Sequence, residues 1–352
     1  MSLGITTAQL NFERLHEIGQ EGRNSKVYLA HDKQLDAQLV IKELAKSTFR
    51  DHAEFYKEAI KLYDSEHQHV VQIKYACEDA NSIYLAMPYY KKGSLKTLID
   101  SRYLTVREII RYATQFLSGL NHIHVKKLIH FDVKPDNILI SDKNEALISD
   151  FGLTKSMNAL GVADATAFYR KQLPPEVFTQ SKHTMLYDIY NAGLTLYRMC
   201  NGNPHYNNQF LKINTDQKTY TEAIEKGIFP DRSLYLPHIP KALRKTINKA
   251  LDVDQQKRQQ TILELINDLS VIDTLLDWEF KFIGDVRVWT LNLEEKTLTV
   301  QVSEDNGTFT ILTLKTMKDS GNTTKVHNSS KSNIVAKEID KTINTFLLSL
   351  NE

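Results

Sequence analysis

Two short runs of residues, separated by a fixed interval, constrain this chain more than any other part of its sequence. Residues 129–137 read IHFDVKPDN, and residues 150–152, which begin thirteen residues after the first run ends, read DFG. Among their side chains are the carboxylates of Asp132 and Asp150, the ammonium group of Lys134 and the amide of Asn137. Phosphoryl transfer uses this set, because a carboxylate orients the attacking hydroxyl, a cation stands near the moving group and oxygen ligands hold Mg²⁺. The two runs therefore predict a site for phosphoryl transfer.

In this register the chain resembles the protein kinases, whose catalytic loop reads H-R-D-x-K-x-x-N and whose magnesium loop reads D-F-G. The resemblance covers about residues 12–276. It implies an α+β, bilobal protein-kinase fold, with a β-rich N-terminal lobe at about 12–87 and a helical C-terminal lobe at about 91–276. We expect these two lobes to form one kinase domain.

Three later matches carry structural roles by the same resemblance. The segment after the magnesium loop ends in Pro-Pro-Glu at residues 174–176, which is similar to the A-P-E end of a kinase activation segment. Asp188 would hydrogen-bond the backbone of the catalytic loop. Arg258, four residues after Asp254, would form a buried ion pair with Glu176.

The hydrophobic pattern agrees with a sheet-rich part followed by a helical part. Strand-like runs occupy residues 26–30, 38–42 and 82–87, and a helical segment is expected over 54–63. Apolar residues then repeat at helical spacing at Ile109, Ile110, Ala113, Phe116, Leu117 and Leu120. A further helix is predicted over residues 261–276.

Residues 277–352 are expected to form a small separate module. Trp278, Phe280 and Phe282 alternate with polar residues, and similar alternation continues to residue 302. A polar stretch over 318–332 predicts a long loop, and the last apolar residues lie on one helical face. The pattern indicates a β-β-β-α module of about three strands and one helix.

The resemblance also implies how a nucleotide would bind. Lys42 would contact the phosphates, and Glu58, sixteen residues later, would hold Lys42 in place. The glycine-rich loop keeps Gly19 and Gly22, but Ser25 stands where a third glycine is usual and the loop is one residue longer. The residues implied to bind ATP are Ile18, Gly19, Gly22, Val27, Val40, Lys42, Met87, Tyr89, Leu139 and Asp150. Those implied to act in catalysis are Asp132, Lys134, Lys42 and Glu58, with Asn137 and Asp150 as metal ligands.

Departures from the family pattern bear on regulation and substrate. Phe131 replaces an arginine that commonly binds a phosphorylated activation-loop residue, so we expect activity that does not depend on such a phosphate. Lys134 resembles the serine/threonine type of catalytic loop. Arg170 and Lys171 would favour acidic or phosphorylated substrates, or they form an ordinary solvated basic pair. Four hydroxyls of the segment remain open to modification, those of Thr154, Ser156, Thr166 and Tyr169.

Composition excludes some other classes of function. A net charge of +1, and the lack of a basic patch with interleaved aromatic residues after residue 277, argue against a nucleic-acid partner. No apolar run approaches the length of a membrane span, so no membrane partner is expected. Cys77 and Cys200 lack metal-ligand spacing, and the pair His122 and His124 faces different sides of a helix. We expect a soluble, cytoplasmic protein.

The resulting hypothesis is a serine/threonine protein kinase of bacterial or phage type. It would use ATP with Mg²⁺, or alternatively Mn²⁺, to phosphorylate protein substrates, itself included. The competing hypothesis is a pseudokinase-like scaffold or binding module, which the irregular glycine loop supports. In either case the C-terminal module would dock on the kinase domain or recruit a partner.

Overall fold

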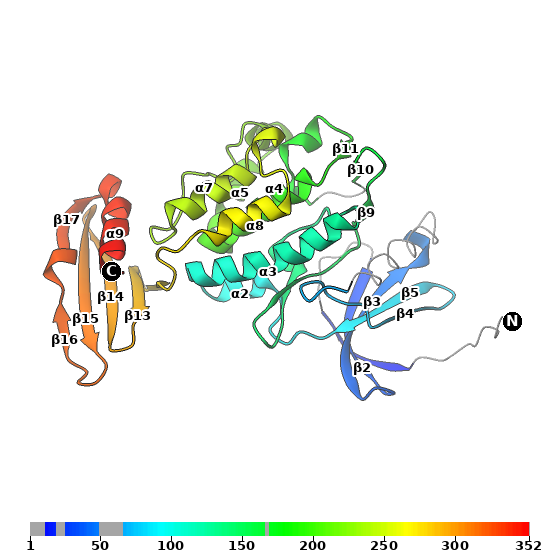
Figure 1. The fold of residues 1–352 in the computed structure, drawn as a ribbon, viewed down its shortest axis with the longest axis horizontal. Helices are drawn as coiled ribbons and strands as arrows, with labels where there is room; N and C mark the ends of the chain where they lie inside the picture. The colour runs from blue at the N-terminus through cyan, green and yellow to red at the C-terminus, as the bar shows by residue number, and fades with distance from the viewer. Residues whose placement is uncertain (1–10, 19–24, 49–65, 166–168, 352) are drawn as a thin grey trace.

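The computed structural model describes residues 11–18, 25–48, 66–165 and 169–351. Over these ranges the chain forms an N-terminal sheet, a helical region (residues 91–276) and a C-terminal region (residues 277–351) with a second sheet. Figure 1 shows the helical region between the two sheets. The expected order of a sheet-rich part followed by a helical part is confirmed.

Among the described residues, five antiparallel strands form the N-terminal sheet in the order β1-β2-β3-β5-β4. The register sets Lys42 opposite Val27 on one neighbouring strand and opposite Leu85 on the other. The three runs predicted as strands all lie inside this sheet, whereas the helix expected over 54–63 lies outside the described residues. The bounds are β1 Phe12–Glu17, β2 Ser25–Asp32, β3 Ala37–Ala45, β4 Tyr75–Glu78 and β5 Ser82–Pro88, with a short 3₁₀ turn η1 Lys46–Thr48.

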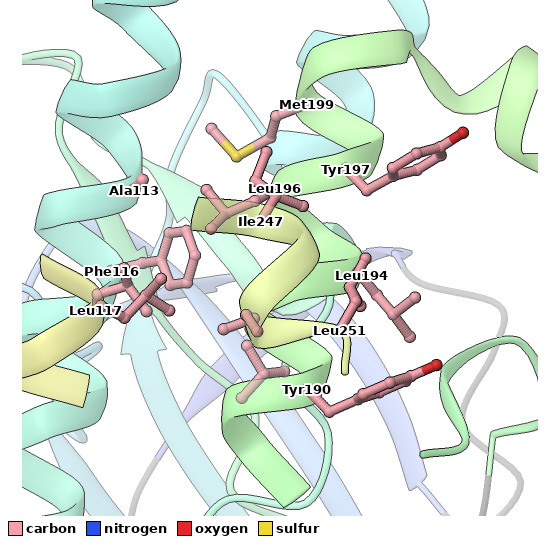
Figure 2. Close-up of a cluster of buried hydrophobic side chains, with 14 of the residues drawn as sticks. Ala113, Phe116, Leu117, Tyr190, Leu194, Leu196, Tyr197, Met199, Ile247 and Leu251 are labelled. Atoms are coloured by element: carbon pink, nitrogen blue, oxygen red, sulfur yellow. The ribbon is translucent and has the colours of Figure 1, made fainter. Parts of the chain in front are cut away.

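The helical region is built around two long helices that bury most of their apolar surface. Its α-helices are α2 Leu95–Ser101, α3 Val106–Val125, α4 Leu186–Asn201, α5 Asn203–Ile213, α6 Gln217–Glu225, α7 Lys241–Ala250 and α8 Ile262–Ser270. Helix α3 begins at a capping box between Thr105 and Glu108 and has the apolar face that the sequence predicts. Every residue of α4 is buried, as expected for a helix surrounded by others. Figure 2 shows Phe116 and Leu117 of α3 packed near Ile247 of α7 and the side chains of α4.

Short strand pairs and turns connect the sheet to these helices and carry the loops of the predicted site. The pairs are β6 Leu128–Ile129 with β9 Lys155–Ser156, β7 Ile138–Ile140 with β8 Ala146–Ile148, and β10 Ala163–Asp164 with β11 Lys182–His183. The 3₁₀ turns are η2 Pro135–Asn137, η3 Arg170–Gln172, η4 Pro175–Phe178 and η5 Gln255–Lys257. The catalytic-loop run thus begins on β6, passes through η2 and ends where β7 begins.

The C-terminal region is a six-stranded antiparallel sheet packed against one helix. Its strand order is β12-β13-β14-β15-β16, and β17 also pairs with β15. Trp278, Trp289 and Val300 belong to its core, together with Ile343 of the helix. The bounds are β12 Glu279–Ile283, β13 Val286–Asn292, β14 Lys296–Asp305, β15 Thr308–Met317, β16 Thr323–Lys325, β17 Lys331–Val335 and α9 Ala336–Leu350, with η6 His327–Ser329.

Two expectations about residues 261–352 are wrong. The expected β-β-β-α module has six strands, because β15 follows the three predicted strands and the stretch 318–332 that predicts a loop contains β16 and the start of β17. All three β16 residues are exposed, so no apolar alternation marks an edge strand whose support comes from backbone pairing with β15. The helix predicted over 261–276 ends at Ser270. Beyond it, Leu275 takes a positive φ of 56°, and the carbonyl of Leu276 accepts the backbone N–H of Arg107.

The C-terminal region contacts the helical region through buried and half-buried side chains. The indole Nε1 of Trp289 donates to Nδ1 of His238 at 3.0 Å, and both residues are fully buried. The ring of Tyr103 lies 4.8 Å from the ring of Phe280, centroid to centroid. Asn344 of α9 donates to the carbonyl of Pro237 at 2.9 Å. Neither in these regions nor elsewhere in the described ranges does a helix have both the length and the apolar character needed to cross a membrane.

Candidate active site

The catalytic loop holds one oxygen of Asp132 and leaves the other without a hydrogen bond from the described residues. Asn137 donates through Nδ2 to Oδ2 of Asp132 at 2.8 Å and to its backbone carbonyl at 2.9 Å. The ammonium of Lys134 lies 2.9 Å from the same Oδ2. The three side chains are therefore brought together as the sequence predicts. Because Oδ2 is occupied, Oδ1 is the atom left to accept a hydroxyl proton.

Asp188 of α4 fixes the backbone that carries this carboxylate. Its Oδ2 accepts the N–H of His130 and its Oδ1 accepts the N–H of Phe131, each at 2.8 Å. Phe131 has a positive φ of 65°, which is strained for a residue with a side chain, so the two bonds stabilise an otherwise unfavourable turn. The predicted role of Asp188 is confirmed. Its buried partner His124 bonds to Oδ2 at 2.8 Å.

His130 of the catalytic loop bridges two backbone segments through hydrogen bonds. Nδ1 of His130 accepts the N–H of Asp132 at 3.2 Å, so its Nε2 carries the proton that it donates to the carbonyl of Ser149 at 3.0 Å. His130 is fully buried. It therefore links the catalytic loop to the residue that precedes Asp150.

Lys42 of β3 reaches Asp150 and forms an ion pair with its Oδ1. The N–H of Gly152 donates to the same oxygen at 3.2 Å. Burial would raise the pKa of the Asp150 carboxyl, but the charge of Lys42 and its hydrogen bond outweigh this and lower that pKa to about 2. Asp150 is thus ionised at neutral pH, as a metal ligand must be.

The residues present fit a magnesium ion held jointly with a triphosphate. Asn137 turns its amide nitrogen toward Asp132, so its Oδ1 faces away, and no described residue donates a hydrogen bond to that oxygen. Ser149 donates to the carbonyl of Asn137 through both N and Oγ, at 2.8 and 3.0 Å, which ties this residue to the strand that leads to Asp150. No group of three or more His, Cys, Asp or Glu in the described ranges could hold a metal. Mg²⁺ commonly takes one or two protein oxygens and completes its shell with phosphate and water.

The residues expected to surround the nucleotide base come from three strands and the loops beside them. Val27, Val40 and Met87 lie on β2, β3 and β5, and Val40 pairs directly with Met87. Ile18, Tyr89 and Leu139 complete the set, and all six are half-buried, so each has surface left for a ligand. Gly19, Gly22 and Glu58 lie outside the described residues.

A comparison with protein families decides which family these residues belong to. The model described as "Protein kinase domain" matches residues 12–269. The chain belongs to this family. The bilobal α+β fold expected for a protein kinase is therefore confirmed, with the site at the junction of the N-terminal sheet and the helical region.

Curated relatives of this kinase-domain chain include bacterial and fungal proteins. A probable serine/threonine-protein kinase of Clostridium acetobutylicum is 28% identical over 273 residues, which cover 76% of this chain and 40% of that protein. Probable serine/threonine-protein kinase PknB of Lactococcus lactis is 26% identical over 268 residues, 74% of this chain and 42% of that protein. The serine/threonine-protein kinase STE20 of Candida glabrata is 27% identical over 270 residues, which cover 73% of this chain and 27% of that protein. The matched part of this chain thus spans less than half the length of these relatives.

The second predicted structural role in the kinase domain is also confirmed. Arg258 donates through Nη1 and Nη2 to the two oxygens of Glu176 at 2.8 and 2.7 Å. Both side chains are almost fully buried. This pair joins the end of the activation segment to the segment before α8.

Phe131 packs in a small apolar cluster rather than facing solvent. Its ring makes an edge contact with Tyr187 at 5.0 Å between centroids, and the cluster includes Ile129 of β6 and Ala163 of the activation segment. Part of the activation segment is thereby attached to the catalytic loop by apolar contact. The sequence shows the missing arginine, but the residues that pack against its replacement are far apart along the chain.

An aromatic residue lies beside Lys134, a contact that the sequence does not reveal. The Lys134 ammonium lies 4.5 Å from the centroid of the Tyr169 ring. Tyr169 precedes Glu176 by seven residues, in a segment that lacks the family's Thr-x-x-Tyr pattern. The sequence alone shows that an unusual residue stands seven positions before Glu176. Only the folded chain brings this residue into contact with Lys134.

Proposed function

We propose that this chain is a protein kinase that transfers the γ-phosphoryl group of ATP to serine or threonine hydroxyls of proteins, its own included. The observation that carries the proposal is the constrained Asp132 carboxylate, with Oδ2 occupied by Lys134 and Asn137 and Oδ1 left for an acceptor hydroxyl. Serine and threonine are preferred as acceptors because Lys134 matches that type of loop and the relatives carry that name.

Each residue then has one task in the reaction. Asp132 orients the acceptor hydroxyl and takes its proton, while Lys134 offsets negative charge on the moving phosphoryl group. Asn137 and Asp150 would hold the metal, and Lys42, braced by Glu58, would bind the phosphates. Bound Mg²⁺, or Mn²⁺ in its place, would supply charge neutralisation across the phosphates.

We divide the chain into a kinase domain at residues 12–276, with lobes at about 12–87 and 91–276, and a C-terminal module at 277–352. Separate apolar cores in the helical and C-terminal regions support this division. We propose that the module docks on the helical lobe through Trp289 and His238, with Tyr103 against Phe280. Replacing Tyr103 by serine would then lower the urea midpoint of unfolding reported by tryptophan fluorescence. An unchanged midpoint would contradict docking.

The proposed compartment is the cytoplasm, where ATP is available and thiols stay reduced, since both cysteines are free. No nucleic-acid or membrane partner belongs to the proposal. Protein substrates remain the proposed partners.

The test is incorporation of labelled phosphate from ATP and Mg²⁺ into the protein itself and into a generic basic protein, for wild type and Asp132→Ala. We expect label on serine or threonine, and loss of at least about 99% of the rate in the variant. Label on tyrosine would overturn the acceptor assignment. Absence of both incorporation and ATP binding in wild type would instead favour the scaffold hypothesis.

A further inference from the structure

We propose that Tyr169 is a positioning residue for phosphoryl transfer, whose ring holds the Lys134 ammonium in place beside Asp132. The inference rests on the proposed kinase function, in which Lys134 acts on the moving phosphoryl group. Tyr169 lies in a segment that lacks the family's usual pattern, so its contact with Lys134 is a feature of this chain.

The Lys134 ammonium has two neighbours in the site, a carboxylate and an aromatic ring. Its ammonium lies 2.9 Å from Oδ2 of Asp132 and 4.5 Å from the centroid of the Tyr169 ring. Only 13% of its side chain is exposed. Cation–π attraction strengthens as the cation is removed from water, so a nearly buried ammonium gains most from it.

Lys134 has a long, flexible side chain. Lysine carries its charge on a four-carbon stem with many rotamers, and one ion pair leaves the ammonium free to swing about its partner. Phosphoryl transfer depends on charges that are already in position. A ring that also contacts the ammonium restricts that swing without removing the charge.

The backbone that carries the Tyr169 ring is held by hydrogen bonds to the turn η3 and to α5 and α6. Tyr169 precedes the turn η3, and its carbonyl accepts the N–H of Gln172 at 2.8 Å. The hydroxyl of Tyr220 on α6 donates to the carbonyl of Arg170 at 2.6 Å, and the hydroxyl of Tyr206 on α5 donates to the carbonyl of Lys171. Both tyrosines are at most 1% exposed. The two helices therefore fix the backbone beside Tyr169.

The side chains of the turn add to this anchoring. The guanidinium of Arg170 lies 4.1 Å from the centroid of the Tyr220 ring and donates to Gln217 at 2.8 Å. Lys171 donates to Asn207 at 3.1 Å. Neither basic residue is simply solvated, and both attach the turn to α5 and α6.

An aromatic ring can hold this ammonium in place where an aliphatic side chain would not. The ammonium of Lys134 is a cation that already pairs with the carboxylate of Asp132. An aliphatic cover would exclude water without offering the cation a partner. The negative face of an aromatic ring excludes water and also attracts the ammonium.

The test compares Tyr169→Phe, which keeps the ring, with Tyr169→Leu, which removes it. Phe309→Leu is the matched control, because Phe309 faces the guanidinium of Arg287 at 5.3 Å in the C-terminal region. We expect Tyr169→Leu to lower kcat about threefold to thirtyfold with KM for ATP within about twofold, since Lys42 and Asp150 are untouched. Tyr169→Phe should retain kcat within about twofold, and the control should match wild type.

A second measurement reports the contact without turnover. The rate at which an amine-reactive reagent acylates Lys134, followed by mass spectrometry at one pH, should rise at least about threefold in Tyr169→Leu and stay near wild type in Tyr169→Phe. Equal acylation in wild type and Tyr169→Leu would overturn the ring contact. Increased acylation with unchanged kcat would overturn the positioning role. A wild type that transfers no phosphate would instead refute the proposed function, and the acylation rates would still decide whether the ring covers Lys134.

Discussion

Replacing Arg258 by methionine is expected to lower the free energy of unfolding of the helical region by about 3 to 5 kcal/mol. Arg258 is 2% exposed and donates to both oxygens of Glu176, to the carbonyl of Leu186 at 3.0 Å and to the carbonyl of Asp252 at 2.8 Å. Methionine fills a similar volume but leaves one buried carboxylate and two carbonyls without their donors. The buried charge is the largest of these terms.

Two further variants separate the ion pair from its surroundings. The double variant Arg258→Met with Glu176→Leu removes both charges and should recover at least about half of the loss, because no uncompensated charge remains. Arg107→Met is the matched control. Arg107 also makes a two-bond contact, with Asp277, but those side chains are 59% and 50% exposed, so about 0 to 1 kcal/mol is expected.

Urea unfolding followed by far-ultraviolet circular dichroism reports the helical region, while tryptophan fluorescence reports the C-terminal region, which contains the two tryptophans Trp278 and Trp289. At about 2 to 4 °C per kcal/mol for a domain of this size, Arg258→Met should also lower Tm by about 6 to 20 °C. A loss no larger than that of Arg107→Met would refute the reasoning. So would a double variant as unstable as Arg258→Met.

Three further outcomes are expected. Asp188→Asn should lower kcat at least about tenfold and the free energy of unfolding by about 1 to 3 kcal/mol, because one of the two carboxylate oxygens that accept backbone N–H groups is lost. Steady-state kinetics and urea unfolding followed by circular dichroism check these two values. Ser156→Ala with Thr166→Ala should keep kcat within about threefold, since the catalytic loop lacks an arginine to bind a phosphate there; a loss above about thirtyfold in a folded variant would contradict it. Burial and then the charge of a nearby arginine lower the pKa of His238 to about 3, against 6.5 unfolded, so the unfolded state takes up the proton as pH falls from about 6.5. As pH falls from about 6.5 to about 3, the free energy of unfolding of wild type should drop by up to about 1.4 kcal/mol per pH unit relative to that of His238→Gln, measured by urea unfolding followed by fluorescence. If the free energy of unfolding varied with pH in the same way for both proteins, the low pKa of His238 would be contradicted.

The polar residues of the catalytic loop could be predicted because their order and spacing are recorded directly in the sequence. Asp132, Lys134 and Asn137 lie within six consecutive residues, so local backbone geometry alone brings them close together. Asp188 and Arg258 could be predicted because each keeps a fixed place in an ordered series of motifs, and the structure confirms their contacts.

Other features depend on contacts that the sequence does not record. The strand β16 carries no apolar alternation, because an edge strand exposed on both faces is supported only by its neighbour. The contact of Tyr169 with Lys134 joins residues 35 positions apart through a turn held by α5 and α6. The expected roles of Gly19, Gly22 and Glu58 remain predictions, since these residues lie outside the described ranges.

The most direct test of the account compares two carboxylates of the same loop. Asp132 lies beside Lys134 and Asn137, whereas Asp136, four residues later, forms an ion pair with Arg198 at 3.7 Å and has no place in the proposed reaction. We would measure kcat for phosphate transfer from ATP in wild type, Asp132→Asn and Asp136→Asn. The account predicts a loss of at least about 100-fold for Asp132→Asn and at most about fivefold for Asp136→Asn. Equal losses in the two variants would contradict it.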